Sequence, residues 1–190
     1  GPSTSTSLVT GASRSAATGR LRIMQVILSH GFAGSERAVA EACNAMCDRH
    51  DVTLVVRGDH RGPGGASIRD HVDPRVDVVE VPGRWRTRRR LAEAIQRIRP
   101  MLIHTHLRRG TRYVAQIRPD AAHVCTLHLS INGPHFLQSD GLFCISEWQL
   151  GTVPVDYRGR VFLVPNSLVP QPRIDADRVR QLKSSLGASD

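Results

Sequence analysis

Short apolar runs and amphipathic segments alternate along the chain. Residues 21–28 (LRIMQVIL) form an apolar run of the length of a strand that is buried on both faces. A loop of small residues follows at 29–35, with glycines at Gly31 and Gly34. Residues 36–47 then carry apolar side chains at helical spacing. Strand, glycine loop and helix in this order predict the first half of a parallel βαβ unit.

The same pattern continues to the end of the chain. About seven strands interleaved with helices predict an α/β fold, a doubly wound, mostly parallel Rossmann-like sheet. The glycine-rich segment 58–74 between two strands is expected to be a mobile lid or a surface insertion. The further strands are expected at 51–57, 76–81, 101–106, 122–128, 141–146 and 160–165, and the further helices at 85–99, at 108–117, from 147 onward and over 175–186.

Composition divides the chain into a tail, one domain and an appendage. Residues 1–20 are rich in Ser, Thr, Gly and Ala and predict a flexible tail, whose leading Gly-Pro resembles a scar of protease cleavage. Residues 21–169 hold the whole predicted sheet, and 170–190 hold a linker and one helix. A hydrophobic content of 40% is enough for a packed core. No apolar run approaches the ~20 residues of a membrane-spanning helix.

Four cysteines lie in apolar segments, which predicts buried, reduced thiols in a cytosolic protein. Cys43, Cys47 and His50 share helical spacing and could be imagined as metal ligands. A fourth ligand is not evident, so we expect core packing at these positions and no metal.

Histidines stand at the ends of three predicted strands, at His30, His106 and His128. The carboxyl ends of parallel strands meet at one edge of the sheet, where ligands bind in such folds. A single histidine in this position is more often a hydrogen-bonded loop residue, whereas several at equivalent strand ends favour a site. His104 alternates with Thr105, and we expect it to point away into a helix layer in a structural role.

The glycine loop GFAGSE has two interpretations, a tight turn or a cradle for phosphate at the start of a helix. It lacks the three-glycine spacing of a dinucleotide site and the Lys-Ser/Thr of a P-loop. A nicotinamide-binding domain is therefore a weaker alternative, and the predicted second strand ends in Arg57-Gly58 where such domains carry an acidic residue.

Six short motifs occur in order along the chain: GFAGSER, HDVTLVV, PMLIHTH, CTLH, FCIS-E and VFLVPNSLV. Together they resemble glycosyltransferase family 4, whose members have the two-domain GT-B fold. The resemblance covers 21–169 and implies the amino-terminal, acceptor-binding domain. It implies that 170–190 leads into a carboxyl-terminal donor-binding domain that this chain lacks, so the chain looks like a truncated enzyme that is inactive alone.

The resemblance also implies a reaction: transfer of a sugar from a nucleotide diphosphate sugar, with retention of configuration and without a metal or other cofactor. The acceptor would be a cell-envelope glycolipid or polysaccharide. His128 matches the histidine that contacts the transferred sugar, and Gly31 and Gly34 match the loop that approaches the donor diphosphate. Leu129 replaces the family's glycine and narrows the acceptor loop. Acceptor contacts are expected from Glu36, His106, Arg108 and Ser130.

The net charge of +9 comes almost entirely from arginine. Ten arginines against one acid lie between Arg84 and Arg112. Cations at a helix start oppose the macrodipole, so helix stability does not explain them.

A solvated face is one interpretation of these arginines, and an anionic membrane or glycolipid at the inner face of the bacterial cytoplasmic membrane is another. Nucleic acid is not expected, because aromatic residues are only 4%. A non-catalytic module that binds such a surface is the alternative function. The candidate patch is Arg84, Trp85, Arg86, Arg88, Arg89 and Arg90.

Overall fold

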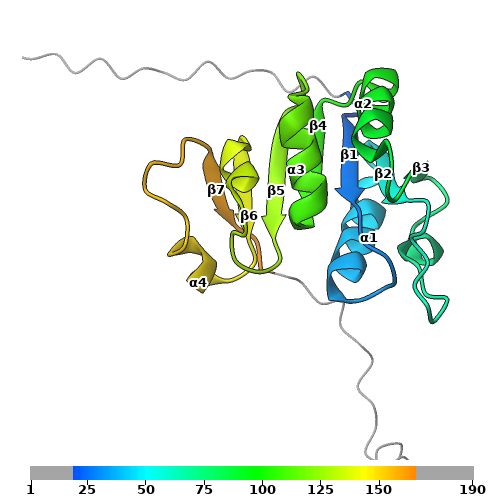
Figure 1. Cartoon of the computed structure of the whole chain (residues 1–190), viewed down its shortest axis with the longest axis horizontal. Helices are drawn as coiled ribbons and strands as arrows, with labels where there is room; N and C mark the ends of the chain where they lie inside the picture. The colour runs from blue at the N-terminus through cyan, green and yellow to red at the C-terminus, as the bar shows by residue number, and fades with distance from the viewer. Residues whose placement is uncertain (1–18, 166–190) are drawn as a thin grey trace, which may run out of the picture.

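A seven-stranded sheet organises the protein, and every neighbouring pair of strands is parallel (Figure 1). The computed structural model describes residues 19–165, so most of the predicted tail and the predicted linker and helix lie outside the described residues. The strand order β3-β2-β1-β4-β5-β6-β7 is that of a doubly wound α/β fold, as predicted. The strands are β1 (Arg22–Ile27), β2 (Asp51–Arg57), β3 (Asp77–Val81), β4 (Leu102–His106), β5 (Ala122–Leu127), β6 (Gly141–Cys144) and β7 (Arg160–Leu163).

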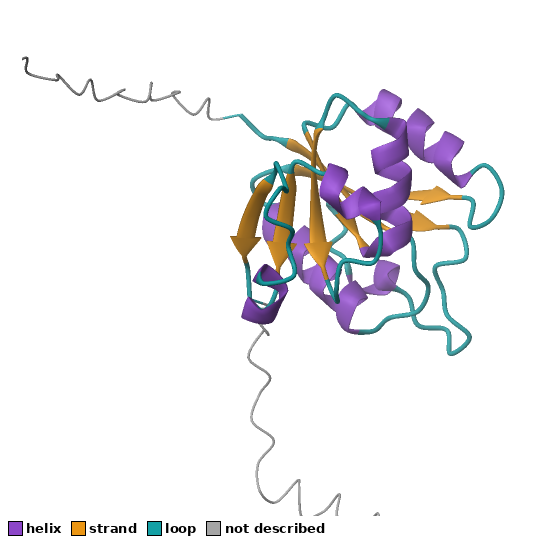
Figure 2. Cartoon of the chain, turned by 60° about the vertical axis from the view of Figure 1, so that its left-hand side comes forward, coloured by secondary structure: helices purple, strands orange, loops and turns teal. Residues whose placement is uncertain are grey.

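Helices cover the two faces of the sheet unequally (Figure 2). One face of β1 and β2 packs against helix α1 (Gly34–Met46), where Val39 meets Leu54 in a fully buried cluster. The other face packs against α2 (Thr87–Ile98) and α3 (Leu107–Ile117). The shorter helices are η1 (Ile68–His71), η2 (Pro134–Gln138) and α4 (Glu147–Leu150).

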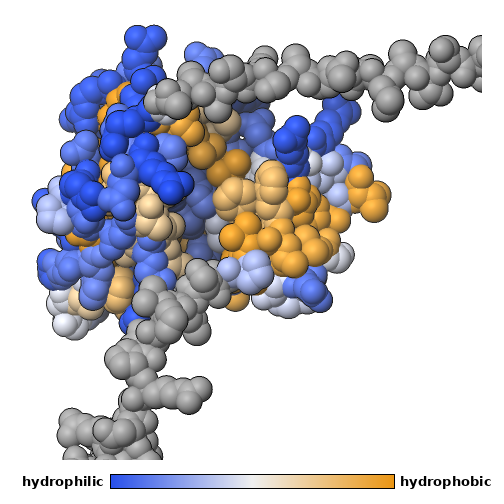
Figure 3. Space-filling model, turned by 180° about the vertical axis from the view of Figure 1, so that it is seen from behind, coloured by the Kyte–Doolittle hydropathy of each residue, from blue (hydrophilic) through white to orange (hydrophobic). Residues whose placement is uncertain are grey.

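The face of the sheet that α1 covers continues across β5–β7 with no described helix over it. Phe143 of β6 lies on this face, because its ring is in edge contact with that of His104 at 5.1 Å between centroids. Phe162 of β7 packs against Phe143 and is 40% exposed. Figure 3 shows an apolar surface on this side of the molecule. The β7 end of this sheet face is therefore exposed to solvent in the described part of the chain.

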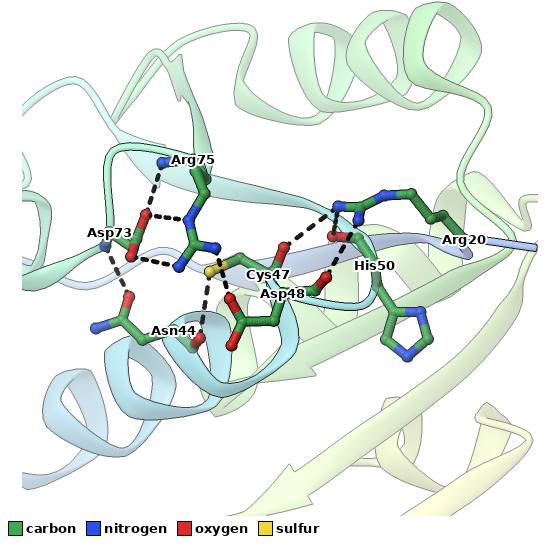
Figure 4. Close-up of polar contacts among 7 residues, drawn as sticks. All are labelled: Arg20, Asn44, Cys47, Asp48, His50, Asp73 and Arg75. Atoms are coloured by element: carbon green, nitrogen blue, oxygen red, sulfur yellow. Dashed lines mark hydrogen bonds and ion pairs between the residues drawn. The ribbon is translucent and has the colours of Figure 1, made fainter.

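Two arginines join the end of α1 to neighbouring segments (Figure 4). Arg20 donates to the backbone oxygen of Cys47 at 3.2 Å. Arg75 contacts Asp48 at 2.5 Å and Asp73 at 2.9 Å. These exposed ion pairs contribute little to stability. They instead fix the position of the segment that follows η1 against the end of α1.

Of the two roles expected for segment 58–74, a mobile lid or a surface insertion, the packing favours the insertion, because the segment contains η1 and buries His60, Ser67 and Ile68 against the domain. One expected helix start was wrong. Helix α2 begins at Thr87 rather than at residue 85, because the residue before it, Arg86, has a left-handed backbone with φ of 62°. All four cysteines are free and buried, as predicted.

Candidate functional site

The loops after β1, β4 and β5 lie along the carboxyl edge of the sheet, since all three strands are parallel neighbours. His106 is the last residue of β4, and His128 directly follows β5. The Nδ1 atom of His106 lies 3.0 Å from Nε2 of His128, which is within hydrogen-bond distance. The negative charge of Glu36, from the first turn of α1, also reaches His128 and acts on its pKa. The glycine loop, His106 and His128 thus share one edge.

The glycine loop is held from behind by the segment after β2. Gly31 has a left-handed φ of 86°, which favours glycine, and its amide donates to the carbonyl oxygen of His60 at 2.9 Å. That amide is therefore not free for a ligand, and Gly31 would serve a diphosphate by leaving room for it. Gly34 is the first residue of α1, and within residues 19–165 no atom beyond the neighbouring backbone lies within 4 Å of the position that a Cβ would take at Gly31 or Gly34. The space in front of the loop is open.

Gly62 permits this close approach, and its replacement tests it. A Cβ at position 62 would lie 2.9 Å from Cα of Gly31, which is backbone and cannot turn aside. We expect Gly62→Ala to displace the glycine loop and to lower the free energy of unfolding by about 1–3 kcal/mol. Urea unfolding measures this. Gly64→Ala is the matched control, because nothing lies within 4 Å of its Cβ position. Equal stability of the two variants would contradict the packing described.

Glu36 supports the glycine loop from inside. Its side chain is buried, and its two carboxylate oxygens accept from the Ser29 hydroxyl at 2.5 Å and from the Ala33 amide at 2.9 Å. Burial alone would raise the pKa of Glu36, but these hydrogen bonds outweigh burial and lower it. Glu36 is thus ionised and stabilises the loop through these two hydrogen bonds. Its contact with an acceptor stays a prediction.

The histidines of β4 form part of a buried polar row. His104 does not point away from the site, because its ring lies 4.2 Å from that of His106 between centroids, on the same face. Period-two alternation places residues 104 and 106 together, and it is Thr105 that faces α3, where it meets Thr111 at 2.9 Å. Burial lowers the pKa of His104 to about 3 and that of His106 well below its usual value. Burial also lowers the pKa of His128, and the charge of Glu36 partly offsets this.

Two glutamines of the site were not predicted. Gln25 is 1% exposed in the middle of β1 and bonds His106 Nε2 at 2.7 Å. Gln149 of α4 is also 1% exposed and donates to the carbonyl oxygens of Leu127 and Leu129, at 2.8 and 2.9 Å. Gln149 therefore fixes the backbone on both sides of His128. A polar residue inside an apolar run is the one signal that could have indicated Gln25.

The remaining predicted acceptor residues lie on the surface near this edge. Arg108 is in the first turn of α3 and Ser130 is in the loop after His128, and both are exposed. Gly133 of that loop lies against Arg108, since a Cβ there would be 3.6 Å from Nε of the arginine. The loop 128–133 therefore runs beside the start of α3.

The arginine patch begins in the loop after β3 and continues into α2. Trp85 is 83% exposed, so its indole is presented to solvent. Arg89 and Arg90 both pair with Glu93, at 3.1 and 2.8 Å. The other patch residues, Arg84, Arg86 and Arg88, are also exposed. Because α2 follows the carboxyl end of β3, the patch starts at the same edge of the sheet as the histidines.

A family model, Glycosyltransferase Family 4, matches residues 32–167 of the chain. The chain belongs to glycosyltransferase family 4. No curated protein matches it significantly in sequence. Among residues 19–165, no helix is both long and apolar enough to cross a membrane.

Solved glycosyltransferases share the fold of this family 4 domain. A glycosyltransferase from Rickettsia africae matches with a TM-score of 0.66 and 13% identity over 90% of this chain and 50% of its own. HepE from Anabaena, in complex with UDP-glucose, matches with a TM-score of 0.67 and 14% identity over 90% of this chain and 51% of its own. The lipopolysaccharide outer core galactosyltransferase WaaB matches with a TM-score of 0.58 and 11% identity, over 82% and 50%. This chain thus spans about half the length of the structures it matches, and corresponds to one domain of a GT-B enzyme.

Proposed function

We propose that this domain is the amino-terminal, acceptor-binding part of a retaining glycosyltransferase that uses a nucleotide diphosphate sugar. The observation that carries the proposal is the shared edge: an open glycine loop at the start of α1 and a neutral histidine, His128, stand on one side of the sheet. The fold neighbour HepE holds UDP-glucose, which supports a nucleotide sugar as donor.

The residues of the edge suit distinct parts of such a substrate. The amino end of α1 at Gly34 carries a partial positive charge that favours the donor diphosphate, whose charge grows as the sugar leaves. The imidazole of His128 would hydrogen-bond a sugar hydroxyl and so orient the donor, which is positioning rather than nucleophilic attack. Arg108 and Ser130 would contact the acceptor from the exposed side. We propose that no metal or other cofactor takes part.

Transfer assays on the natural protein, including any sequence that follows residue 190, test this function. The expected result is that a UDP- or GDP-sugar is consumed only with a glycolipid or polysaccharide acceptor, and that the product keeps the anomeric configuration of the donor. The 190-residue chain alone should fold but not turn over. Inversion of configuration, or turnover by this chain alone, would contradict the proposal.

We further propose that the acceptor is a cell-envelope glycolipid or polysaccharide, which a cytoplasmic enzyme would meet peripherally at the inner membrane face. Support comes from Trp85 and the arginines beside it, because indole rings favour the membrane interface and arginines favour anionic headgroups. The same patch carries the second candidate function, a non-catalytic module that binds an anionic glycolipid or membrane.

Vesicle flotation tests the patch. Each arginine near an anionic surface contributes about 1 kcal/mol, so reversing Arg86, Arg88 and Arg89 to Glu should weaken binding to phosphatidylglycerol vesicles by about 100-fold or more. The matched control reverses three exposed arginines elsewhere, Arg49, Arg97 and Arg158, which alters the net charge equally. Equal losses for both triple variants would show a general charge effect and no patch. Binding by a protein that lacks sugar transfer would favour the second function.

A further inference from the structure

A line of hydrogen bonds crosses the sheet just below the candidate site. It runs along the face of the sheet that α1 covers, through buried side chains of β5, β4 and β1, and returns to the residue after β5. The links are Thr126 Oγ1 to His104 Nε2 at 2.6 Å, His104 Nδ1 to Gln25 Nε2 at 3.3 Å, Gln25 Oε1 to His106 Nε2 at 2.7 Å, and His106 Nδ1 to His128 Nε2 at 3.0 Å.

Every member of this line can donate at one end and accept at the other. A neutral imidazole has one N–H and one bare nitrogen, so a ring that accepts at Nδ1 donates from Nε2. The line therefore has two self-consistent polarities, which differ in the tautomer of each histidine and in a half-turn of the Gln25 amide. The amide of Gln25 distinguishes them, because its oxygen only accepts and its nitrogen only donates.

The position of the Gln25 oxygen selects one polarity. Oε1 faces His106 Nε2, so that nitrogen carries the proton and donates. The bare Nδ1 of His106 then accepts from His128, whose proton must sit on Nε2. Nδ1 of His128 is left bare. It has no hydrogen-bond partner among residues 19–165, and it is not one of the buried unpaired atoms of this part of the chain, so it is at least partly exposed there.

Burial keeps the rings neutral, as this reasoning requires. His106 is 4% exposed, and the low pKa values of His104 and His106 exclude a second proton near neutral pH. No carboxylate bonds His104 or His106 in the described part of the chain, and Glu36 is the acid whose charge reaches His128.

We propose that Gln25 is a positioning residue that acts through His106 to fix His128 as a hydrogen-bond acceptor at Nδ1. The group that this nitrogen recognises is a hydroxyl, which donates a proton, and not an anionic phosphate or carboxylate oxygen, which would repel its lone pair. The tautomer follows from the hydrogen bonds alone, and its use on a sugar hydroxyl rests on the proposed function.

Long-range nitrogen–proton NMR correlation on the uniformly nitrogen-15-labelled chain reads the tautomer of each imidazole directly. His128→Asn assigns the signals of that ring. The expected result near neutral pH is that His128 is protonated at Nε2 with an acceptor-type shift at Nδ1. Protonation of His128 at Nδ1 would overturn the proposal, because it requires the opposite polarity of the whole line.

Two variants of Gln25 separate its oxygen from its bulk. Gln25→Glu keeps an oxygen to accept from His106, so His128 should keep its tautomer. Gln25→Met keeps the volume but removes the acceptor, so the His128 signals should change to a mixture of both tautomers. A folded Gln25→Met protein, judged by circular dichroism, with an unchanged His128 tautomer would also overturn the proposal. If that variant does not fold, the wild-type and Gln25→Glu spectra decide.

The consequence for transfer is measured in the natural protein. One hydrogen bond to the sugar is worth about 0.5–1.5 kcal/mol, so Gln25→Met should lower kcat by up to about tenfold, while Gln25→Glu stays closer to wild type. A protein with the expected tautomers and no sugar transfer would refute the proposed function and leave the role of Gln25 standing. Sugar transfer by a protein whose His128 is protonated at Nδ1 would support the proposed function and refute the role of Gln25.

Discussion

Acidification from about pH 7 to about pH 5 is expected to lower the free energy of unfolding by about 4 kcal/mol through His104 and His123, with a further loss from His106. Burial lowers the pKa of His104 to about 3 and that of His123 to about 4, and the pKa of His106 lies well below its usual value. Unfolding returns each of these histidines to a pKa of about 6.5, so the unfolded chain binds protons that the folded chain does not bind. His104 and His123 then each cost about 2 kcal/mol at about pH 5, and His106 adds to this loss.

The loss should begin as the pH falls below about 6.5 and level off as it passes the folded values, from about 4 for His123 to about 3 for His104. Since a domain is stable by only about 5–15 kcal/mol, acid should bring this one close to unfolding. Urea unfolding at several pH values measures the effect. His123→Gln should reduce the loss by about 2 kcal/mol, since it removes one of these groups. A pH dependence that is the same in wild type and variant would contradict this origin.

Replacement of His128 by Ala is expected to slow sugar transfer by about 100-fold, because the donor sugar loses the group that orients it. The half-buried position of His128 means that the fold should survive the change. Steady-state kinetics on the natural protein measure kcat and KM for the nucleotide sugar, and the loss should appear mainly in kcat.

The matched control for this variant is His50→Ala, which removes a histidine between α1 and β2, at the other edge of the sheet. Its kinetics should equal those of wild type. An unchanged kcat in the His128→Ala protein would remove His128 from the reaction, and a similar loss in both variants would indicate a general effect on stability.

The strands could be predicted closely because a parallel sheet buries whole apolar runs. Residues 51–57 were expected as a strand and form β2, and β3 lies within the expected strand 76–81. Helix ends were harder to predict. The start of α2 depends on the left-handed backbone of Arg86. An arginine rarely adopts this conformation, and the pattern of apolar and polar residues does not predict it.

The histidines at the strand ends could be predicted as neighbours, but their connections could not. Gln25 lies in an apolar run, and its partner His106 is 81 residues away in sequence. Gln149 reaches back by 22 residues to the carbonyl oxygen of Leu127. Such contacts depend on which strands are adjacent, which the tertiary fold decides. His104 was misplaced for a simpler reason, since alternation along β4 already puts it on the face of His106.

The packing of segment 58–74 was missed because glycines suggest mobility when read in sequence. In the structure Gly62 instead allows two backbones to approach, and the buried His60 supplies the carbonyl oxygen that holds Gly31. The glycine content thus reflects close packing behind the glycine loop.

A structure of the natural protein with an intact nucleotide sugar would show directly where the donor binds on this domain. We expect the diphosphate in the open space before Gly31 and Gly34, and a sugar hydroxyl within about 2.7–3.2 Å of Nδ1 of His128. A nucleotide sugar bound at the amino edge of the sheet, or at the carboxyl edge with its sugar turned away from His128, would contradict this expectation.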